Sequence, residues 1–361
     1  MNARERFNKV MHWQKADRVP NMDFGYWNET IPIWHTQGLP KEIKNAVQLE
    51  KHLKLEGMDS IPTISLRNAF LPGFKREVLE DKGDHQIIID GNGVICEISK
   101  TAVSIPKYIK YSLETREDWD KIKKEKLDPL VKGRVLPKEQ WKKLVDTAHA
   151  EGMPVRVSVG SLYGWLRNWM GVENFSIAMM TDKDWVEDMM EHLTQMTLYM
   201  IDQTLPGLEV DFAAWWEDMA YNHGPLCSPK LFEELMVPRY KRITDKLKTY
   251  GIDVNVLDCD GCIYELVPGW LESGINCMFP IEAAWTDPLE LRKRWGKKAL
   301  LIGGVNKLEL AKGKAAIDAE LAKLKPLIDD GGYIPTVDHR VPPDVSYENY
   351  LYYIEQKLKI L

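Results

Sequence analysis

The sequence predicts an α/β fold, a single (β/α)8 TIM-type barrel with a β-hairpin-containing insertion after its second strand. Short apolar runs rich in β-branched residues alternate with longer stretches of helical periodicity, as in parallel strands joined by crossover helices. The chain has 361 residues, of which 44% are hydrophobic, so it has enough apolar material for one large core. Barrels of this length fold as one unit. We therefore expect one domain over residues 1–361.

The predicted strands are short apolar runs, each followed by polar or turn residues. They are residues 19–24, 59–65, 155–159, 210–215, 253–257, 275–279, 299–302 and 333–337. Helical stretches lie between them. In residues 183–201, for example, Trp185, Met189 and Leu193 recur at three- and four-residue intervals on one face. That pattern is typical of a crossover helix packed on a sheet.

One long interruption of the alternation, residues 67–136, follows the second predicted strand. Two β-rich runs, 87–89 and 94–98, flank the turn Gly91-Asn92-Gly93, which is typical of a hairpin. An insertion at this point lies at the C-terminal ends of the strands. There it could cover the mouth of the barrel as a lid.

Composition excludes several classes of function. The net charge is -6 and the two signs are interspersed, so there is no concentrated basic face for nucleic acid. No apolar stretch approaches the roughly 20 residues of a membrane span, and the N-terminus lacks a signal peptide, so we expect a cytoplasmic protein. Five cysteines without regular spacing argue against a secreted disulfide scaffold. The absence of a Gly-x-Gly-x-x-Gly motif, a phosphate loop or a serine elbow disfavours nucleotide-dependent and serine-hydrolase mechanisms.

Residues that directly follow the strands form the active site in barrels of this kind. Asp258 and Asp260 follow the fifth predicted strand, and His339 follows the eighth. Several carboxylates at one mouth repel each other, and such clusters usually bind a metal or act as acid and base. We therefore predict these three residues to be catalytic, although one aspartate could cap a helix and His339 could be an ordinary hydrogen-bonded histidine. The predicted substrate-binding residues are Tyr26, Trp27, Tyr163, Arg167, Trp216 and Asn306.

Several segments occur together in a recognisable order. They are Ala3-Arg4-Glu5-Arg6-Phe7 with Asp17-Arg18-Val19-Pro20, then Val256-Leu257-Asp258-Cys259-Asp260-Gly261, Ile302-Gly303-Gly304 and Tyr333-Ile334-Pro335. With these segments the chain resembles the uroporphyrinogen decarboxylase superfamily over essentially its whole length. The resemblance implies a β/α barrel that is either a tetrapyrrole decarboxylase or a corrinoid-dependent methyltransferase.

The segment after the first strand separates the two branches. The decarboxylases have Met-Arg-Gln-Ala-Gly-Arg there, and its arginines receive the carboxylates of the substrate. This chain has Asp23-Phe24-Gly25-Tyr26-Trp27-Asn28-Glu29 instead, which offers acids and aromatic rings. The chain is therefore closer in character to the methyltransferase branch.

The resemblance also implies a metal. Methyltransferases that methylate coenzyme M bind zinc through His-x-Cys after the fifth strand and Cys after the eighth. With Gly261 aligned, Asp258 and Asp260 stand at the His-x-Cys positions and His339 lies near the last cysteine. This departure from the pattern means that zinc-thiolate activation of a thiol is not carried over. Oxygen ligands with imidazole suit a more Lewis-acidic metal, which cleavage of a methyl ether needs because its oxygen leaves poorly unless it is coordinated or protonated.

The resemblance thus implies Zn²⁺ held by some of Glu217, Asp258, Asp260 and His339. The substrate would be a methylated small molecule, in particular an aryl methyl ether held by aromatic side chains. Its methyl group would pass to the Co(I) centre of a corrinoid that a partner protein supplies.

Two alternatives stay open. A metal-free lyase resembling uroporphyrinogen decarboxylase would use Asp258 and Asp260 as acid and base. A non-catalytic corrinoid carrier would need a cobalt-binding Asp-x-His-x-x-Gly motif, which the chain lacks, although docking a corrinoid protein does not need one. The sequence does not decide the methyl donor, and it leaves a homodimer open.

Overall fold

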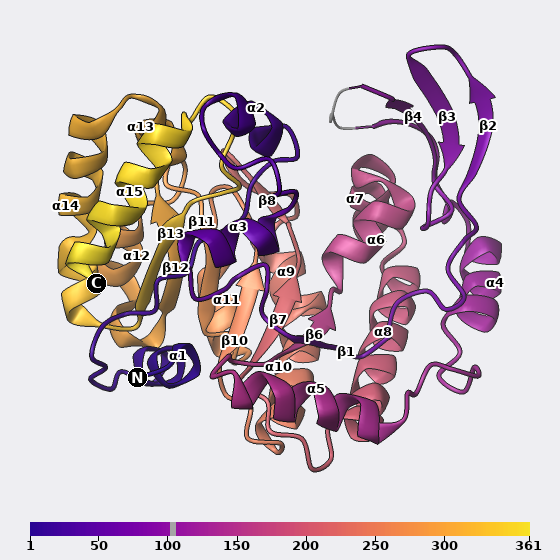
Figure 1. Ribbon diagram of the computed structural model, residues 1–361. Helices are drawn as coiled ribbons and strands as arrows, with labels where there is room; N and C mark the ends of the chain where they lie inside the picture. The colour runs from indigo at the N-terminus through magenta and orange to yellow at the C-terminus, as the bar shows by residue number, and fades with distance from the viewer. Residues whose placement is uncertain (102–105) are drawn as a thin grey trace.

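Seven parallel strands form the central sheet of the computed structural model, which describes residues 1–101 and 106–361 (Figure 1). Their order in the sheet follows their order in the chain, as expected when each crossover returns to the neighbouring position. Within this described part, seven of the eight predicted strands are therefore confirmed. They are β1 (Thr63–Ser65), β6 (Arg156–Gly160), β7 (Phe212–Trp216), β10 (Asn255–Asp258), β11 (Cys277–Ile281), β12 (Leu300–Val305) and β13 (Tyr333–Val337).

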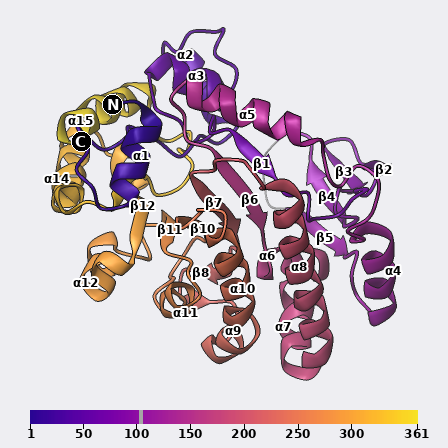
Figure 2. The ribbon, with the colours of Figure 1, turned by 90° about the horizontal axis from the view of Figure 1, so that it is seen from below.

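Helices surround the strands when the molecule is seen from below (Figure 2). The predicted helix 183–201 is confirmed as the longest crossover helix, and its Trp185, Met189 and Leu193 are buried as the periodicity predicts. Across the described ranges, no helix combines the length and apolar character needed to cross a bilayer. The helices are α5 (Lys138–Ala150), α6 (Tyr163–Met170), α7 (Val172–Thr181), α8 (Lys183–Thr204), α9 (Pro229–Leu235), α10 (Val237–Lys248), α11 (Val267–Glu272), α12 (Pro288–Trp295), η1 (Gly296–Lys298), α13 (Lys307–Ala311), α14 (Lys314–Asp330) and α15 (Tyr347–Ile360).

Helix α1 (Ala3–Met11) lies beneath the N-terminal ends of the strands (Figure 1). A capping box between Asn2 and Glu5 starts this helix. Its Phe7 is 1% exposed, and the ring centroid lies 4.7 Å from that of Phe212 on β7. The helix therefore covers the bottom of the sheet's inner face with an aromatic side chain. Helices α2 (Thr30–Thr36) and α3 (Ala46–Leu53) follow it in the chain.

The region predicted as an insertion, 67–136, contains antiparallel strands and helix α4 (Arg116–Lys126), and it stands away from the central sheet (Figure 1). Strands β3 and β4 pair across a turn, with Ile89 opposite Ile95. Residues 102–105 of this region lie outside the described residues. Its role as a lid stays a prediction. The remaining strands are β2 (Glu77–Asp81), β3 (His85–Ile89), β4 (Ile95–Ser99) and β5 (Lys107–Lys110), with β8 (Ala220–Tyr221) and β9 (Gly224–Pro225) in the loop after β7.

The prediction of a first strand at residues 19–24 is wrong. Pro20 has no N–H to donate to a strand ladder. The Asp23 carboxylate, rather than a backbone carbonyl, accepts the N–H of Val337 on β13 at 2.8 Å. A single bridge, Tyr26 to Val341, is the β pairing of this segment in the described residues. A side chain thus replaces the backbone hydrogen bonds that a first strand would make.

The same aspartate binds the C-terminal helix. Asp23 is 1% exposed and accepts a hydrogen bond from the hydroxyl of Tyr350 on α15. The ammonium of Lys357, which is fully buried, lies 3.9 Å from Asp23 and donates to the carbonyl of Met22 at 2.7 Å. Burial lowers the pKa of Lys357, and Asp23 opposes that shift. The carboxylate of Asp23 and the ammonium of Lys357 therefore stabilise each other in the core.

Replacing Asp23 should destabilise the whole fold. In Asp23→Ala the ammonium of Lys357 stays buried without its anion, so the free energy of unfolding should fall by about 3–5 kcal/mol. Urea denaturation monitored by tryptophan fluorescence measures this change. The exposed Asp318, which bonds only to Tyr352 within the described residues, gives the control variant Asp318→Ala. Equal midpoints for the two variants would contradict a structural role for the buried pair.

Candidate active site

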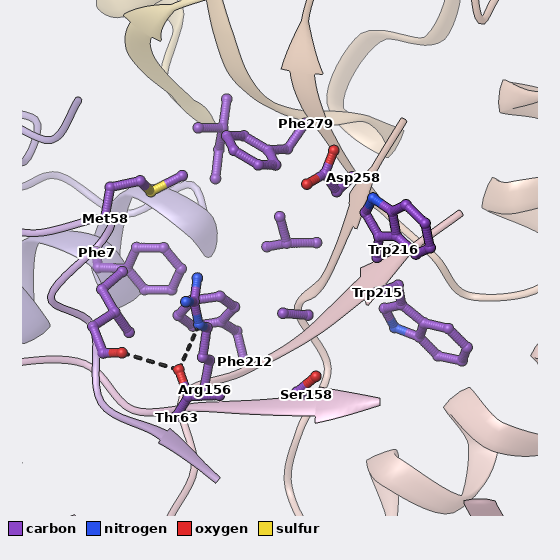
Figure 3. Close-up of a pocket in the computed structure, with 14 residues that line it drawn as sticks. Phe7, Met58, Thr63, Arg156, Ser158, Phe212, Trp215, Trp216, Asp258 and Phe279 are labelled. Atoms are coloured by element: carbon purple, nitrogen blue, oxygen red, sulfur yellow. Dashed lines mark hydrogen bonds between the residues drawn. The ribbon is translucent and has the colours of Figure 1, made fainter. Parts of the chain in front are cut away.

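A cavity of about 180 Å³ lies on the inner face of the sheet (Figure 3). Two small side chains from adjacent strands, Ser158 and Ala214, line its middle at one level, and Val256 on the next strand stands level with Ala214. Bulky branched residues usually fill this layer in β/α barrels. The small side chains on these strands therefore leave the space that forms the cavity.

The two ends of the cavity carry different groups, a guanidinium at one end and a carboxyl at the other. Side chains alternate along a strand, so residues two apart on β6, β7 and β10 face the same interior. Arg156 is level with Phe212 near the bottom, whereas Asp258 is level with Trp216 at the C-terminal ends of the strands. Figure 3 shows the guanidinium at one end of the cavity and the carboxyl at the other.

Arg156 has few protein partners. Its Nε donates to the hydroxyl of Thr63 at 2.8 Å, and in residues 1–101 and 106–361 its terminal nitrogens make no hydrogen bond or ion pair. Burial lowers the pKa of Arg156, while the charges of Asp59, Asp258 and Glu50 raise it. An arginine nevertheless stays protonated in proteins. The cavity therefore contains a positive charge with unused donors.

Asp258 occupies the opposite end, where burial favours its neutral form. Burial raises the pKa of Asp258 well above its ordinary value, and the carboxylates of Asp260 and Asp218 raise it further, against smaller effects of Arg340 and Arg156. Among the described residues, no group donates a hydrogen bond to the Asp258 side chain. A protonated carboxyl that faces a cavity can act as a general acid.

The structure brings together the other two predicted catalytic residues. Nε2 of His339 lies 3.2 Å from Oδ2 of Asp260, at the C-terminal ends of β13 and β10. Trp27 stacks on the imidazole with ring centroids 5.3 Å apart, and Phe24 meets its edge at 5.7 Å. Both polar side chains are partly exposed, 21% for His339 and 32% for Asp260. They therefore form a pair at the mouth that solvent can reach.

Glu217, the remaining predicted metal ligand, lies at the turn between β6 and α6. It is fully buried, and its carboxylate accepts hydrogen bonds from the Ser161 hydroxyl at 2.7 Å and from three backbone N–H groups. Burial raises the pKa of Glu217, and these donors lower it. The carboxylate thus holds the turn between β6 and α6. Its backbone donors are Leu162, Tyr163 and Gly164.

The four predicted zinc ligands consequently do not fit a common metal ion in this arrangement. The oxygens of Glu217 are bound to the α6 turn, whereas Asp260 and His339 face each other at the mouth. In the part of the chain that the structure describes, no three His, Cys, Asp or Glu side chains are grouped to hold a metal. Zinc stays a prediction from the family resemblance.

The predicted substrate-binding residues fall into separate places. Trp216 lines the interior cavity, and Arg167 lies over its ring at 5.4 Å while pairing with Asp218 at 2.7 Å. Tyr26 and Trp27 line a second cavity of about 420 Å³ outside the sheet. The structure therefore assigns Trp216 to the interior and the two N-terminal aromatics to the rim.

Two of the predicted substrate-binding residues, Tyr163 and Asn306, make contacts that stabilise the fold. Tyr163 is fully buried against Phe175, with centroids 5.1 Å apart, and it does not line the interior cavity. The side chain of Asn306 accepts from the N–H of Leu308 and so caps α13. Neither residue lines the interior cavity.

Sequence reasoning missed the residues inside the strands. Arg156 and Ser158 precede the strand ends that were searched for polar residues, yet they line the cavity. A signal was present in the sequence, because Arg156-Val157-Ser158-Val159 places polar side chains on one face of a strand expected to be buried on both. A charged residue at an inward position of such a strand indicates a polar cavity.

Comparison with known proteins gives a family and a fold. The sequence profile of uroporphyrinogen decarboxylase (URO-D) matches residues 87–356. No curated protein matches the chain significantly. The structure is similar to a methyltransferase from Methanosarcina mazei with a TM-score of 0.62, at 13% identity and over 99% of both chains. A chitinase from Rhizomucor miehei matches with a TM-score of 0.35, at 11% identity, over 63% of this chain and 88% of that one.

Glu217 should prove structural in solution. Glu217→Ala leaves several buried donors without an acceptor, so the free energy of unfolding should fall by about 3 kcal/mol or more. Glu217→Gln keeps one acceptor oxygen and should lose less. Chemical denaturation of both variants, with the exposed Glu209→Ala as control, measures the difference. Unfolding midpoints that match wild type in Glu217→Ala would contradict this assignment.

Proposed function

The chain belongs to the uroporphyrinogen decarboxylase (URO-D) family, and we propose that it is a methyltransferase that moves the methyl group of a small methyl ether to the Co(I) centre of a separate corrinoid protein. The observation that carries the proposal is the size of the cavity between Arg156 and Asp258. A volume of about 180 Å³ suits a ligand near the size of benzene, which fills an engineered cavity of about 150 Å³. A tetrapyrrole has four rings and is far larger. The cavity therefore favours a small methyl donor over tetrapyrrole decarboxylation.

The lining of the cavity supports an aromatic donor. Phe212, Trp216 and Phe279 contribute rings to its wall, and such rings bind a flat aromatic ligand through stacked or edge contacts. The fold similarity to a methyltransferase agrees with methyl transfer as the reaction class. An aryl methyl ether satisfies both observations.

Asp258 supplies the chemistry that an ether requires. The electron pair of the breaking C–O bond stays on the oxygen, which leaves poorly unless it gains a proton. Asp258 donates that proton as the bond breaks, and the product is a phenol or alcohol. The bound corrinoid supplies the electron pair for the new bond to the methyl carbon. Burial of Asp258 supports this role because it keeps the proton on the carboxyl.

No step in this proposal passes through zinc. The zinc content of the purified protein, measured by mass spectrometry for wild type and His339→Ala, tests the prediction of zinc on its own.

Methyl transfer can be measured with free cob(I)alamin as the acceptor. Donors that differ only in the methylated atom, with oxygen, sulfur or nitrogen on the same ring, are each supplied in neutral and carboxylated forms. We expect the corrinoid spectrum to change with the oxygen donors. Reaction with only the sulfur or nitrogen donors would contradict the ether assignment, and decarboxylation of uroporphyrinogen without methyl transfer would favour the lyase.

Asp258→Asn should lower kcat by roughly 10²- to 10⁴-fold, the usual contribution of a general acid. The loss should be smaller for 4-nitroanisole than for anisole, because nitrophenolate leaves without protonation. Asp253→Asn, at an exposed position two residues before β10, is the matched control. An equal loss for the two ethers would show that Asp258 does not protonate the leaving oxygen.

A further inference from the structure

The unused donors of Arg156 identify a feature of the substrate. We propose that the interior cavity binds methyl donors that carry a carboxylate, with the carboxylate on the guanidinium of Arg156 and the methyl group toward the mouth. This inference rests on the proposed methyl transfer and names the class of substrate. Arg156 is the only cation among the described residues that line the cavity.

The acids whose charges act on Arg156 do not contact it. Glu50 is 2% exposed and accepts the backbone N–H groups of Asp59 and Ser60 at 2.9 and 3.1 Å. Asp59 lies 3.7 Å from Arg340, and among the described residues its Oδ2 has no hydrogen-bond partner. No carboxylate within the described ranges comes within 4 Å of Arg156. Arg156 is half-buried, so its charge is only partly solvated, and a bound anion would supply the close partner that it lacks.

The chemistry of the cavity floor matches a carboxylate. The guanidinium is planar, and its parallel N–H groups fit the two oxygens of a carboxylate. The Ser158 hydroxyl also lines the cavity, and it makes no hydrogen bond within the described residues. It can donate to the same anion. A neutral ligand would leave the charge unpaired, and a cationic ligand would be repelled.

The length of the cavity sets the orientation of the donor. Phe212, level with Arg156, and Trp216, level with Asp258, are four residues apart on β7, which is roughly 13 Å along an extended strand. The arginine side chain spans part of that distance. An aromatic ring with a carboxylate at one end and a methoxy group at the other spans the remainder. Its ether oxygen then faces Asp258, and its methyl carbon faces the mouth.

Binding of benzoate and benzamide to the purified protein, measured by calorimetry, tests the carboxylate site without any corrinoid. Wild type should bind benzoate at least about tenfold more tightly than benzamide, because charge-assisted hydrogen bonds are the stronger kind. Arg156→Met should abolish this preference. Arg242→Met, which removes a partly exposed arginine from α10, should retain it. Equal affinities of wild type for the two ligands would overturn the inference.

A second variant keeps the test decisive if Arg156→Met does not fold. Ala214→Leu adds an apolar side chain to the middle layer, leaves the charge in place and should abolish binding of both ligands. Benzoate affinity unchanged in Ala214→Leu would also overturn the inference, because the ligand would then bind elsewhere.

Methyl transfer separates this inference from the proposed function. Preference for benzoate combined with no transfer from any methyl donor would contradict the function and leave the carboxylate site supported. Transfer from anisole and 4-methoxybenzoate with equal kcat/KM would contradict the carboxylate site and support the function. A higher kcat/KM for 4-methoxybenzoate, lost in Arg156→Met, supports both.

Discussion

A positive charge inside the sheet is the constraint on which the site depends. Arg156 points inward from the third predicted strand, where a β/α barrel usually packs branched apolar side chains. Its charge cannot be lost, because arginine stays protonated, so the interior must offer it hydrogen bonds or an anion. Thr63 satisfies one donor, and the small side chains of Ser158 and Ala214 leave space beside the others. A packed layer thereby becomes a cavity with a charged floor.

The upper end of the same cavity carries carboxyl groups. Asp258 is placed among other carboxylates, which favour its protonated form, while Asp260 is already paired with His339 at the mouth. Trp27 stacks on that histidine and fixes the plane of its ring. Asp258 and Asp260, separated by one residue, thus have different surroundings. Asp258 faces the cavity, and Asp260 pairs with His339 at the rim.

The sequence predicts the sheet well because apolar β-branched runs report burial directly, and residues 333–337 form a strand with the predicted bounds. It fails at residues 19–24, where an aspartate side chain replaces backbone pairing, and local composition does not reveal that replacement. The rule that places active sites after strands finds Asp258 and Trp216. It does not find Arg156, which stands within a strand. Nor can it show which way Glu217 turns, since only the packed α6 turn decides that.

The central claim is that a carboxylated aromatic molecule occupies the interior cavity. A crystal structure of the protein with 4-bromobenzoate tests it, because anomalous scattering locates the bromine without ambiguity. We predict the carboxylate on Arg156 and the bromine on the side of Asp258, near the rings of Trp216 and Phe279, which are level with it. Bromine in the outer cavity beside Tyr26 and Trp27, with the interior left free, would contradict it.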